Sequence, residues 1–534
     1  MTAVTSAPRP AVLALSWRLV RRSTLILWAA VAVYVVIEVA SYTSAYPDAA
    51  SRQHLAKFGD NPAVRMLQGL PRNVDTIGGF VAWDGGWFLE WLLAIWALLT
   101  VSRLLRADEE SDRASLVHAV ALRPRAVMLL QVAVVCTGSL GFGAVLAVVL
   151  AGAGTELGGA VLHGAAIAAF GIAATAVGAV TSQLVDVRKR AATLGVAVLA
   201  VGYFLRMVAN SNPARGWLRW ASPFGWMDEL HPYGAPRLAS LALLLVVAAL
   251  TLVAAGVLRE RRDGGGAIVT LDDRAPEHPR LLKSPLGLGW RVTRGALLAW
   301  TLGLSSYAVL MGSMLKTLVD YVREDPSFVA TLKTFGIDPT DITRGMVSIL
   351  ASMFGLAFAL YASWRLGAAR VEEESGRADL LLARPVTRVR WLGGHLLLAG
   401  GSVAVLAAGC GGGLWLGAWL TGGQLSAADG LRATLNPLPA VLVLASVAVL
   451  LLGVRPRLTV SLSASAAAVA YLLPSLGSAL SWPQWLLDLS PFSHLALVPA
   501  EGYALQSGLV MLGVAALLMG IGVRAFARRD TVGA

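Results

Sequence analysis

Apolar runs of about 20 residues recur along the whole chain, and each is long enough to cross a bilayer core of roughly 30 Å. Only 14% of the 534 residues are charged, whereas soluble proteins carry about 25%. The pattern predicts an all-α polytopic membrane protein with about twelve transmembrane helices. The run at 391–420 is rich in glycine, so we expect that helix to be broken or tilted. The expected spans are 24–45, 79–103, 126–152, 159–184, 192–210, 237–258, 295–318, 345–367, 391–420, 433–453, 458–478 and 506–524.

Basic residues set the expected orientation of these spans. The formal net charge is +12, and the arginines gather in short loops and chain ends next to the apolar runs. Short cytoplasmic loops of membrane proteins are enriched in Arg and Lys, so we expect both termini on the cytoplasmic side. The longer segments 46–78 and 319–344 are then external. Because the positive charge has this topological role and no nucleic-acid motif occurs, we expect no nucleic-acid partner.

Several short patterns occur twice, in the same order. This repetition indicates a tandem duplication, in which an even number of spans per copy keeps both copies in one orientation. We expect a first six-span half over 1–264 and a second over 265–534. The repeated patterns are Trp17 and Arg21 with Trp290 and Arg294, the acidic segments 108–116 and 372–380, and Ser222-Pro223-Phe224 with Ser490-Pro491-Phe492.

The two acidic segments each follow the second span of a half. They are interpreted either as solvated loops that flank a span or as short helices that dock into a partner protein. Acidic residues favour a helix N-terminus through the helix dipole, and the arginine that follows lies within reach of them. Because both copies keep the pattern, docking is favoured. The candidate docking residues are Asp108, Glu109, Glu110, Ser111 and Arg113 in the first copy and Glu372, Glu373, Glu374, Ser375 and Arg377 in the second, with Leu116 and Leu380 as apolar contacts.

No catalytic or nucleotide-binding motif accompanies these segments. The sequence lacks H-E-x-x-H, G-x-S-x-G, a Cys and His cluster at metal-ligand spacing, and the P-loop pattern G-x-x-x-x-G-K-[ST]. We therefore predict no enzyme activity, no catalytic or metal-binding residues and no cofactor on this chain. If ATP drives the protein, a partner chain must bind the ATP and its Mg²⁺.

An aromatic and basic pair precedes the first span of each half: Trp17 with Arg21, and Trp290 with Arg294. Each pair suits an amphipathic helix in the membrane interface, with Trp at headgroup depth and Arg in water. Each also suits an ordinary aromatic and positive flank of a span, and the sequence leaves both interpretations open.

Charged residues inside the expected spans occur in the first half. Such charges are costly in a membrane unless they are paired or face a cavity. Two interpretations remain open: a structural ion-pair network, and a substrate path that attracts cationic or polar cargo. The charged residues are Glu38, Glu90 and Arg206 at a similar depth and Asp84 nearer the outside. The counterparts of the first three in the second half are apolar, namely Met311, Phe354 and Leu473.

The stretch 372–388, which contains Glu372-Glu373-Glu374-Ser375 and Arg384-Pro385, resembles the segment after the second span of ABC-2 type exporter permeases. In that family this segment is the coupling helix, which sits in the nucleotide-binding subunit. The whole chain resembles the actinobacterial exporters of polyketide antibiotics, including tetronasin-type multidrug exporters, in which one chain carries two six-span halves. The first acidic segment departs from the pattern, because Asp112 stands in place of Gly376.

The resemblance implies a type V ABC exporter fold in a bacterial inner membrane. An interfacial elbow helix would precede each half, and the first, second and fifth spans would line the path. Two copies of a separate ATPase subunit would dock on the two acidic segments. Hydrolysis of ATP by that partner would drive the export of amphipathic small molecules such as antibiotics.

Two other classes share parts of this pattern. Proton-coupled transporters of the major facilitator type also have twelve spans in two halves, but their loop between spans two and three is usually basic and glycine-rich. A membrane-embedded glycosyltransferase would carry an acidic catalytic loop outside, where segment 46–78 has only Asp48, Asp60 and Asp75. The sequence therefore favours the exporter permease, and it leaves the cargo unnamed.

Overall fold

The computed structural model describes residues 8–49, 51–52, 55, 62–110, 122–262, 266–269, 284–324, 342–383, 385–477 and 482–529. Over these residues the chain forms helices and turns and no strand. Twelve of the described helical segments are long and apolar enough to cross a membrane. The prediction of an all-α polytopic membrane protein with about twelve transmembrane helices is therefore confirmed. Contacts within the chain separate two compact units, Met1–Ala275 and Pro276–Ala534.

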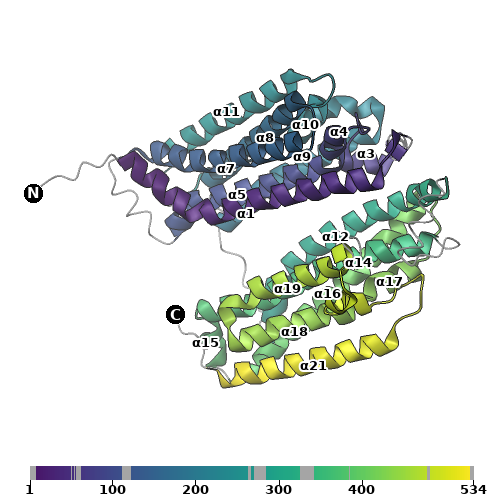
Figure 1. The fold of residues 1–534 in the computed structure, drawn as a ribbon. Helices are drawn as coiled ribbons and strands as arrows, with labels where there is room; N and C mark the ends of the chain where they lie inside the picture. Colours follow the sequence, from purple (N-terminus) through teal and green to yellow (C-terminus); the bar gives the residue numbers. More distant parts are fainter. Residues whose placement is uncertain are drawn as a thin grey trace, which may run out of the picture. The chain divides into compact units, whose positions relative to one another are not determined.

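In the first unit the long helices run side by side, and α3, α4 and α10 gather at one end of them, here called the distal end (Figure 1). The opposite end, where α5 and α11 finish, is here called the basic end. The second crossing is formed by α4, the π-helical turn η2 and α5 together. The elements are α1 (Pro8–Ala45), α3 (Pro62–Gln68), α4 (Ile77–Phe80), η2 (Val81–Gly85), α5 (Gly86–Glu110), α7 (Pro124–Gly152), α8 (Leu157–Leu184), α9 (Arg188–Ser211), the 3₁₀ helix η3 (Pro213–Ala221), α10 (Pro223–Leu230) and α11 (Leu238–Glu260).

Small residues allow α8 to pack closely in the interior of the first unit. A Cβ atom added to Gly164 on α8 would lie 2.3 Å from the carbonyl oxygen of Gly143 on α7, and one added to Gly143 would lie 2.1 Å from that of Gly164. No larger side chain fits at either position unless a helix backbone moves. Contacts between small residues are a common way for membrane helices to associate.

The Ser-Pro-Phe pattern has the same structural role in both units. The hydroxyl of Ser222, at the start of α10, donates a hydrogen bond to the carbonyl oxygen of Gly202 on α9 at 2.6 Å. In the second unit the hydroxyl of Ser490 donates to the carbonyl oxygen of Ala470 on α19 (Thr459–Gly477) at 2.5 Å. Each serine therefore fixes the short helical turn after the fifth span against that span.

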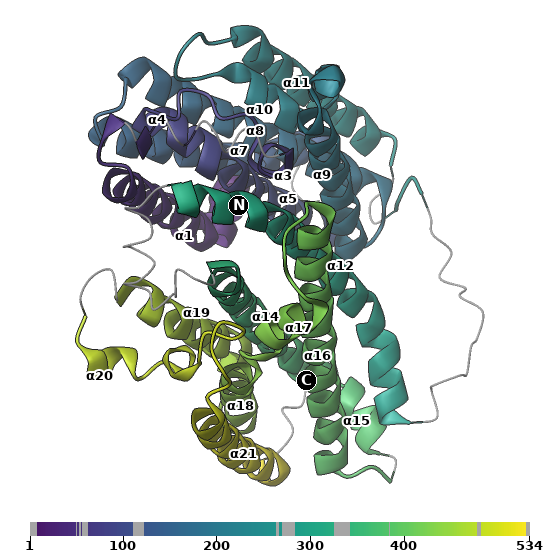
Figure 2. The same ribbon diagram turned by 90° about the vertical axis from the view of Figure 1, so that its right-hand side faces the viewer.

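The second unit has the same succession of long helices. Its basic end is the end where α14 and α21 finish, and the short helix α15 lies there in both views (Figures 1 and 2). Its elements are α12 (Pro285–Glu324), α14 (Ile342–Glu374), α15 (Arg377–Leu382), α16 (Arg388–Leu420), α17 (Ala427–Leu435), α18 (Leu438–Val454), the 3₁₀ helix η5 (Pro456–Leu458), α19, α20 (Gln484–Leu487), the 3₁₀ helix η6 (Pro491–His494) and α21 (Leu505–Arg528).

The glycine-rich run at 391–420 is not broken, contrary to expectation, because it forms the single helix α16. Its glycines serve contact with α12. A Cβ atom added to Gly413 would lie 2.6 Å from the carbonyl oxygen of Ser305, and one added to Gly417 would lie 2.0 Å from the carbonyl oxygen of Val309. A membrane helix satisfies its backbone hydrogen bonds internally, so glycines need not break it, and they allow close packing against another helix.

Replacing Gly417 by leucine is expected to destabilise the second unit, because the new side chain would collide with the backbone of α12. Overpacking of this kind typically costs about 1–3 kcal/mol. Gly412 is the matched control, since it lies on the same helix and an added Cβ there would meet nothing within 4 Å. Thermal unfolding of the purified chain should show a lower midpoint for Gly417→Leu than for Gly412→Leu. Equal midpoints would contradict the packing argument.

Candidate functional site

At the basic end of the first unit, Glu109 is the centre of a buried cluster of arginines. Its carboxylate accepts hydrogen bonds from Arg262 and Arg106, both at 2.7 Å, and lies 3.5 Å from a guanidinium nitrogen of Arg259. All four side chains are more than nine-tenths buried. The cluster therefore ties the end of the second span to the end of the sixth.

The second unit contains the same kind of contact. Glu373, near the end of α14, accepts a hydrogen bond at 2.8 Å from Arg529, which follows α21. The Glu373 side chain is only 2% exposed. In both halves the middle glutamate of the acidic triplet thus points into its own unit. Among the candidate docking residues, Glu109 and Glu373 act as internal anchors.

The rest of the second acidic segment includes an exposed helix, α15. It begins after Gly376, whose φ of +69° is a backbone conformation that favours glycine and that turns the chain away from α14. Ala378 is buried in an apolar cluster formed with residues of α14, α16, α18 and α21. Arg377 and Asp379 are exposed, and the Leu380 side chain is 74% exposed. α15 therefore presents one apolar side chain between charges.

The other acidic residues of this segment have partners within the second unit. Glu372 lies 3.4 Å from His395 on α16, and Glu374 accepts a hydrogen bond from Arg370 at 2.6 Å. The Ser375 hydroxyl donates to the carbonyl oxygen of Glu372. In the first segment only the Glu109 side chain is described. The predictions for the side chains of Asp108 and Glu110, for Ser111 and Arg113, and for Leu116 fall outside the described residues.

The aromatic and basic pairs lie in the first turns of long helices. Trp17 and Arg21 belong to α1, and Trp290 and Arg294 belong to α12, and neither pair has a helix of its own. No proline interrupts either helix between its pair and its apolar run, so the helix continues into the span. Trp17 is half-buried against the core of the first unit, whereas Arg21, Trp290 and Arg294 are exposed. Their placement at a membrane interface stays a prediction.

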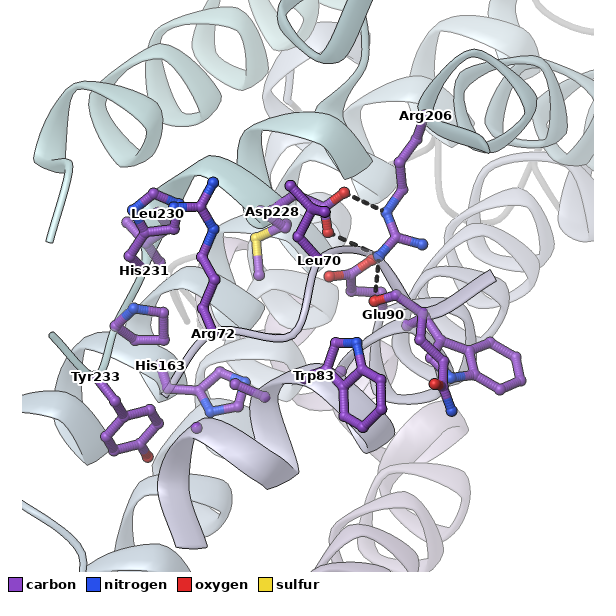
Figure 3. A pocket seen from close by; sticks show the side chains of 17 residues that line it. Leu70, Arg72, Trp83, Glu90, His163, Arg206, Asp228, Leu230, His231 and Tyr233 are labelled. Carbon is purple, nitrogen blue, oxygen red and sulfur yellow. Dashed lines mark hydrogen bonds and ion pairs between the residues drawn. The ribbon is translucent and has the colours of Figure 1, made fainter. Parts of the chain in front are cut away.

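A pocket opens at the distal end of the first unit, between the second crossing, α8, α9 and α10 (Figure 3). Its empty volume is about 620 Å³, which includes space open to solvent. Two of the charged residues predicted from the sequence, Glu90 and Arg206, both line it. We call this cavity the distal pocket.

Arg206 is fully buried in the wall of the distal pocket, and Asp228 on α10 is its counter-ion. The guanidinium donates two hydrogen bonds to the Asp228 carboxylate, at 2.8 and 2.7 Å. It donates two more to the carbonyl oxygens of Leu67 and Gln68, at 2.8 and 2.9 Å. Asn210 donates to the same carboxylate at 2.8 Å. Arg206 therefore neutralises Asp228 and fastens the end of α3 to α9 and α10.

A second wall of the pocket is one face of the second crossing. Small residues make room there, and an added Cβ atom at Gly86 would meet nothing within 4 Å. Glu90 lies at the far end of this face, is 4% exposed, and its Oε2 has no hydrogen-bond partner among the described residues. The π-helical turn η2 lies within this face, and such turns are frequent at functional sites. The face consists of Gly79, Ala82, Trp83, Gly86, Trp87 and Glu90.

The opposite side of the pocket is basic, and its residues Arg72, His231 and Tyr233 lie outside the candidate spans. Burial lowers the pKa of Arg72 and of His231, and the positive charge of Arg72 lowers the pKa of His231 further. Burial also raises the pKa of Tyr233 to about 12. No hydrogen bond or ion pair joins Arg72 to the described part of the chain. The His163 ring is buried on α8 and meets the Tyr233 ring edge to face.

Glu38 and Asp84 lie beside the distal pocket and do not line it. Glu38 is 9% exposed, and its Oε1 has no partner among the described residues. Its carboxyl group lies next to that of Asp84. Asp84 accepts a hydrogen bond at 2.7 Å from Gln68, which does line the pocket. The structure thus brings all four predicted charged residues to one end of the first unit, without pairing Arg206 with Glu38 or Glu90.

The second unit has aromatic packing at the counterpart of Glu90. Phe354 is 3% exposed and stacks on Phe358, with ring centroids 6.3 Å apart. The centroid of the Tyr307 ring lies 6.1 Å from that of the Phe354 ring. Within the described ranges of the whole chain, no three His, Cys, Asp or Glu side chains come together as metal ligands would.

The chain matches a known protein family in both halves. The family described as "Multidrug efflux system permease Rv1217c, C-terminal domain" matches residues 10–261 and 282–527. The chain belongs to this family. It is also 35% identical, over 509 residues, to the multidrug efflux system permease protein Rv1217c of Mycobacterium tuberculosis (strain ATCC 25618 / H37Rv). The match covers 92% of this chain and 90% of that protein.

Sequence reasoning on this member of the Rv1217c family missed Asp228. Asp228 lies in a short helix outside the apolar runs, so no cost of burial in a membrane drew attention to it. The repeated Ser222-Pro223-Phe224 pattern was the available signal, since it marks the segment that folds back onto the fifth span, where Arg206 lies. His163 was also missed, because a single histidine in an apolar run is usually a packed residue.

Proposed function

We propose that this protein is the membrane-spanning subunit of an ATP-binding-cassette exporter that removes drugs from the cell. Its family and its mycobacterial relative carry the name of a multidrug efflux permease, which supports a permease for drug efflux. The sequence has no P-loop of its own, so the ATP and its Mg²⁺ would be bound by a separate ATPase chain. The cargo would be amphipathic small molecules such as antibiotics.

The observation that carries this proposal is α15. This six-residue helix leaves Leu380 74% exposed, and Arg377 and Asp379 on it are exposed too, so it offers an apolar contact and two charges to a partner chain. Its inner face rests on four long helices of the second unit, so a force on α15 would reach them directly. In the proposed cycle, closure of the ATPase pair pushes on this helix and on the first acidic segment.

The distribution of arginines supports the orientation that this proposal needs. The ends of α5, α11, α14 and α21 carry Arg residues, and the positive-inside rule assigns such ends to the cytoplasm. Both termini and both acidic segments would then face the cytoplasm of a cell whose inner membrane holds the protein. One acidic segment in each of two six-span halves would give two docking sites, so one chain would bind two ATPase copies.

Replacing Leu380 by aspartate should lower the affinity for the ATPase at least tenfold, because the apolar contact would be replaced by a charge. The thermal unfolding midpoint should stay unchanged, because Leu380 is mostly exposed. The measurement is the amount of cognate ATPase that co-purifies with the co-expressed chain, together with its drug-stimulated ATP hydrolysis.

Val454 is the matched control, since it is 60% exposed at the basic end of the same unit but lies on α18. Val454→Asp should co-purify with the ATPase like the wild type. Equal loss in both variants would contradict a specific role of α15. Native mass spectrometry of the wild-type complex should give two ATPase chains per permease chain, and a ratio of one to one would contradict the proposed assembly.

The two rival classes are not favoured. The chain belongs to a family that is named for efflux permeases, and neither the major facilitator class nor the membrane glycosyltransferases enter that description. Export that stops on ATP depletion and survives an uncoupler would support the ATP-driven mechanism.

A further inference from the structure

Buried polar atoms without partners converge on the distal pocket. Five such atoms have no hydrogen-bond partner among the described residues, and they come from α5, α8 and the turn after α10. Buried polar groups in native proteins are nearly always paired, and leaving one unpaired costs about 1–3 kcal/mol. The pocket is therefore built to hold a polar occupant. The five atoms are Trp87 Nε1, Glu90 Oε2, His163 Nδ1, His231 Nε2 and Tyr233 Oη.

Two opposite charges line the pocket and form no salt bridge with a described residue: the buried Glu90 and the exposed Arg72. The charge of Arg206 is matched by Asp228, as shown by their two short hydrogen bonds. The Glu90 carboxylate and the Arg72 guanidinium make no ion pair within the described part of the chain. Figure 3 shows Arg72 with His231 and His163 on one side of the pocket and Glu90 with Trp83 on the other. The pocket thus has an acidic side and a basic side.

We propose that the distal pocket binds a small zwitterion, with its ammonium group at Glu90 and its acidic group at Arg72. An ammonium supplies N–H donors to the free oxygen of Glu90 and the charge that a buried carboxylate requires. The indole rings beside Glu90 add attraction for a cation. A carboxylate or phosphate at the other end of the ligand pairs with the guanidinium of Arg72.

A ligand with one charge fits this pocket less well. A simple amine would pair with Glu90 but would make no contact with Arg72. A simple carboxylate would pair with Arg72 and leave Glu90 unpaired. The same chemistry occurs in a free amino acid and in a lipid headgroup that carries an ammonium and a phosphate.

This inference does not depend on the ATPase. The pocket lies within the first unit, at the end opposite the Glu109 cluster, so ligand binding is measurable on the full permease chain alone. Failure of binding there would leave the coupling at α15 untouched, and failure of coupling would leave the pocket untouched.

The test is calorimetric titration of the purified full chain in uncharged maltoside micelles. The probes are ω-amino acids from β-alanine to 6-aminohexanoate and phosphoethanolamine, each compared with the amine and the carboxylate of the same length. At least one zwitterion should bind ten or more times more tightly than both of its singly charged analogues. Glu90→Gln and Arg72→Gln should each weaken that zwitterion at least tenfold.

Matched controls separate binding from folding. Glu156→Gln removes an exposed carboxylate at the same end of the unit and should leave binding unchanged. Gly86→Leu fills the pocket and should abolish binding, whereas Gly152→Leu, at a second glycine with open space around it, should not. All variants should have thermal unfolding midpoints close to that of the wild type, because none of these groups pairs with another described residue of the first unit.

Two results would overturn the proposal. If no zwitterion binds more tightly than its singly charged analogues, the pocket holds water only. If Glu90→Gln and Gly86→Leu bind a zwitterion as the wild type does, the ligand lies elsewhere. Nanodiscs distinguish the two sources. If the ligand is a lipid, phosphatidylethanolamine should raise the unfolding midpoint of the wild type, whereas phosphatidylcholine should not, and neither lipid should raise the midpoint of Glu90→Gln. If the ligand is a free small molecule, the midpoint should not depend on which of the two lipids is present.

Discussion

Replacing Arg206 by leucine is expected to lower the free energy of unfolding of the first unit by about 3–5 kcal/mol. The substitution leaves the Asp228 carboxylate, whose side chain is 16% exposed, with Asn210 as its remaining described partner. It also removes the donors to the carbonyl oxygens of Leu67 and Gln68. The measurement is the thermal unfolding midpoint of the purified chain, which should fall by several degrees.

Arg215→Leu is the control, since Arg215 is exposed at the distal end and makes one long hydrogen bond of 3.4 Å to Ser211. Its midpoint should match that of the wild type. The double variant Arg206→Leu with Asp228→Leu should be more stable than the sum of the two single changes, because an apolar pair leaves no buried charge. A wild-type midpoint in Arg206→Leu would show that the network carries no stability.

Glu109→Gln should destabilise the first unit by about 3 kcal/mol, because it removes a carboxylate that serves three buried arginines. Arg106 and Arg262 would then be left with carbonyl oxygens, and all three arginines would face a neutral amide in place of the carboxylate. Glu373→Gln should cost less, since its partner Arg529 is 16% exposed and therefore partly solvated. Thermal unfolding of the purified variants gives the comparison.

Glu260→Gln is the control for the first unit. Glu260 is 49% exposed and lies 3.4 Å from Arg125, and a surface pair of this kind is worth about 1 kcal/mol or less. The same experiment separates anchoring from docking. If Glu109 contacted the ATPase directly, Glu109→Gln would weaken ATPase binding and leave the unfolding midpoint unchanged, and that result would contradict its role as an internal anchor.

The Arg206 network and the Glu109 cluster show which parts of the site could be predicted from the sequence. The sequence identified Glu90 and Arg206 because charged residues stand out in apolar runs, and both do line one pocket. It could not identify the partners of Arg206 or of Glu109. Arg206 donates to Leu67 from 139 residues away in sequence, and Arg262 reaches Glu109 over 153 residues. Such separations leave no local pattern.

In the acidic segments, too, the sequence predicted the location of a feature, and packing decided which of its side chains are buried. Their repetition marked the basic end of each half as a contact region, and in the second half the residues after Gly376 do form a short exposed helix. The sequence treated all three acids of each triplet alike. Only packing shows that the middle one is buried, because burial depends on where the sixth span ends relative to the second.

The amino-acid sequence by itself determined the number and approximate limits of the membrane-length helices. Hydropathy is a property of each short stretch, so the cost of exposing that stretch to water can be read without knowing its neighbours. The tertiary structure alone decided which charges are neutralised and which are free. That outcome depends on side chains from different segments meeting at one point, as Asp228 does with Arg206, while Glu90 and Arg72 form no salt bridge with a described residue.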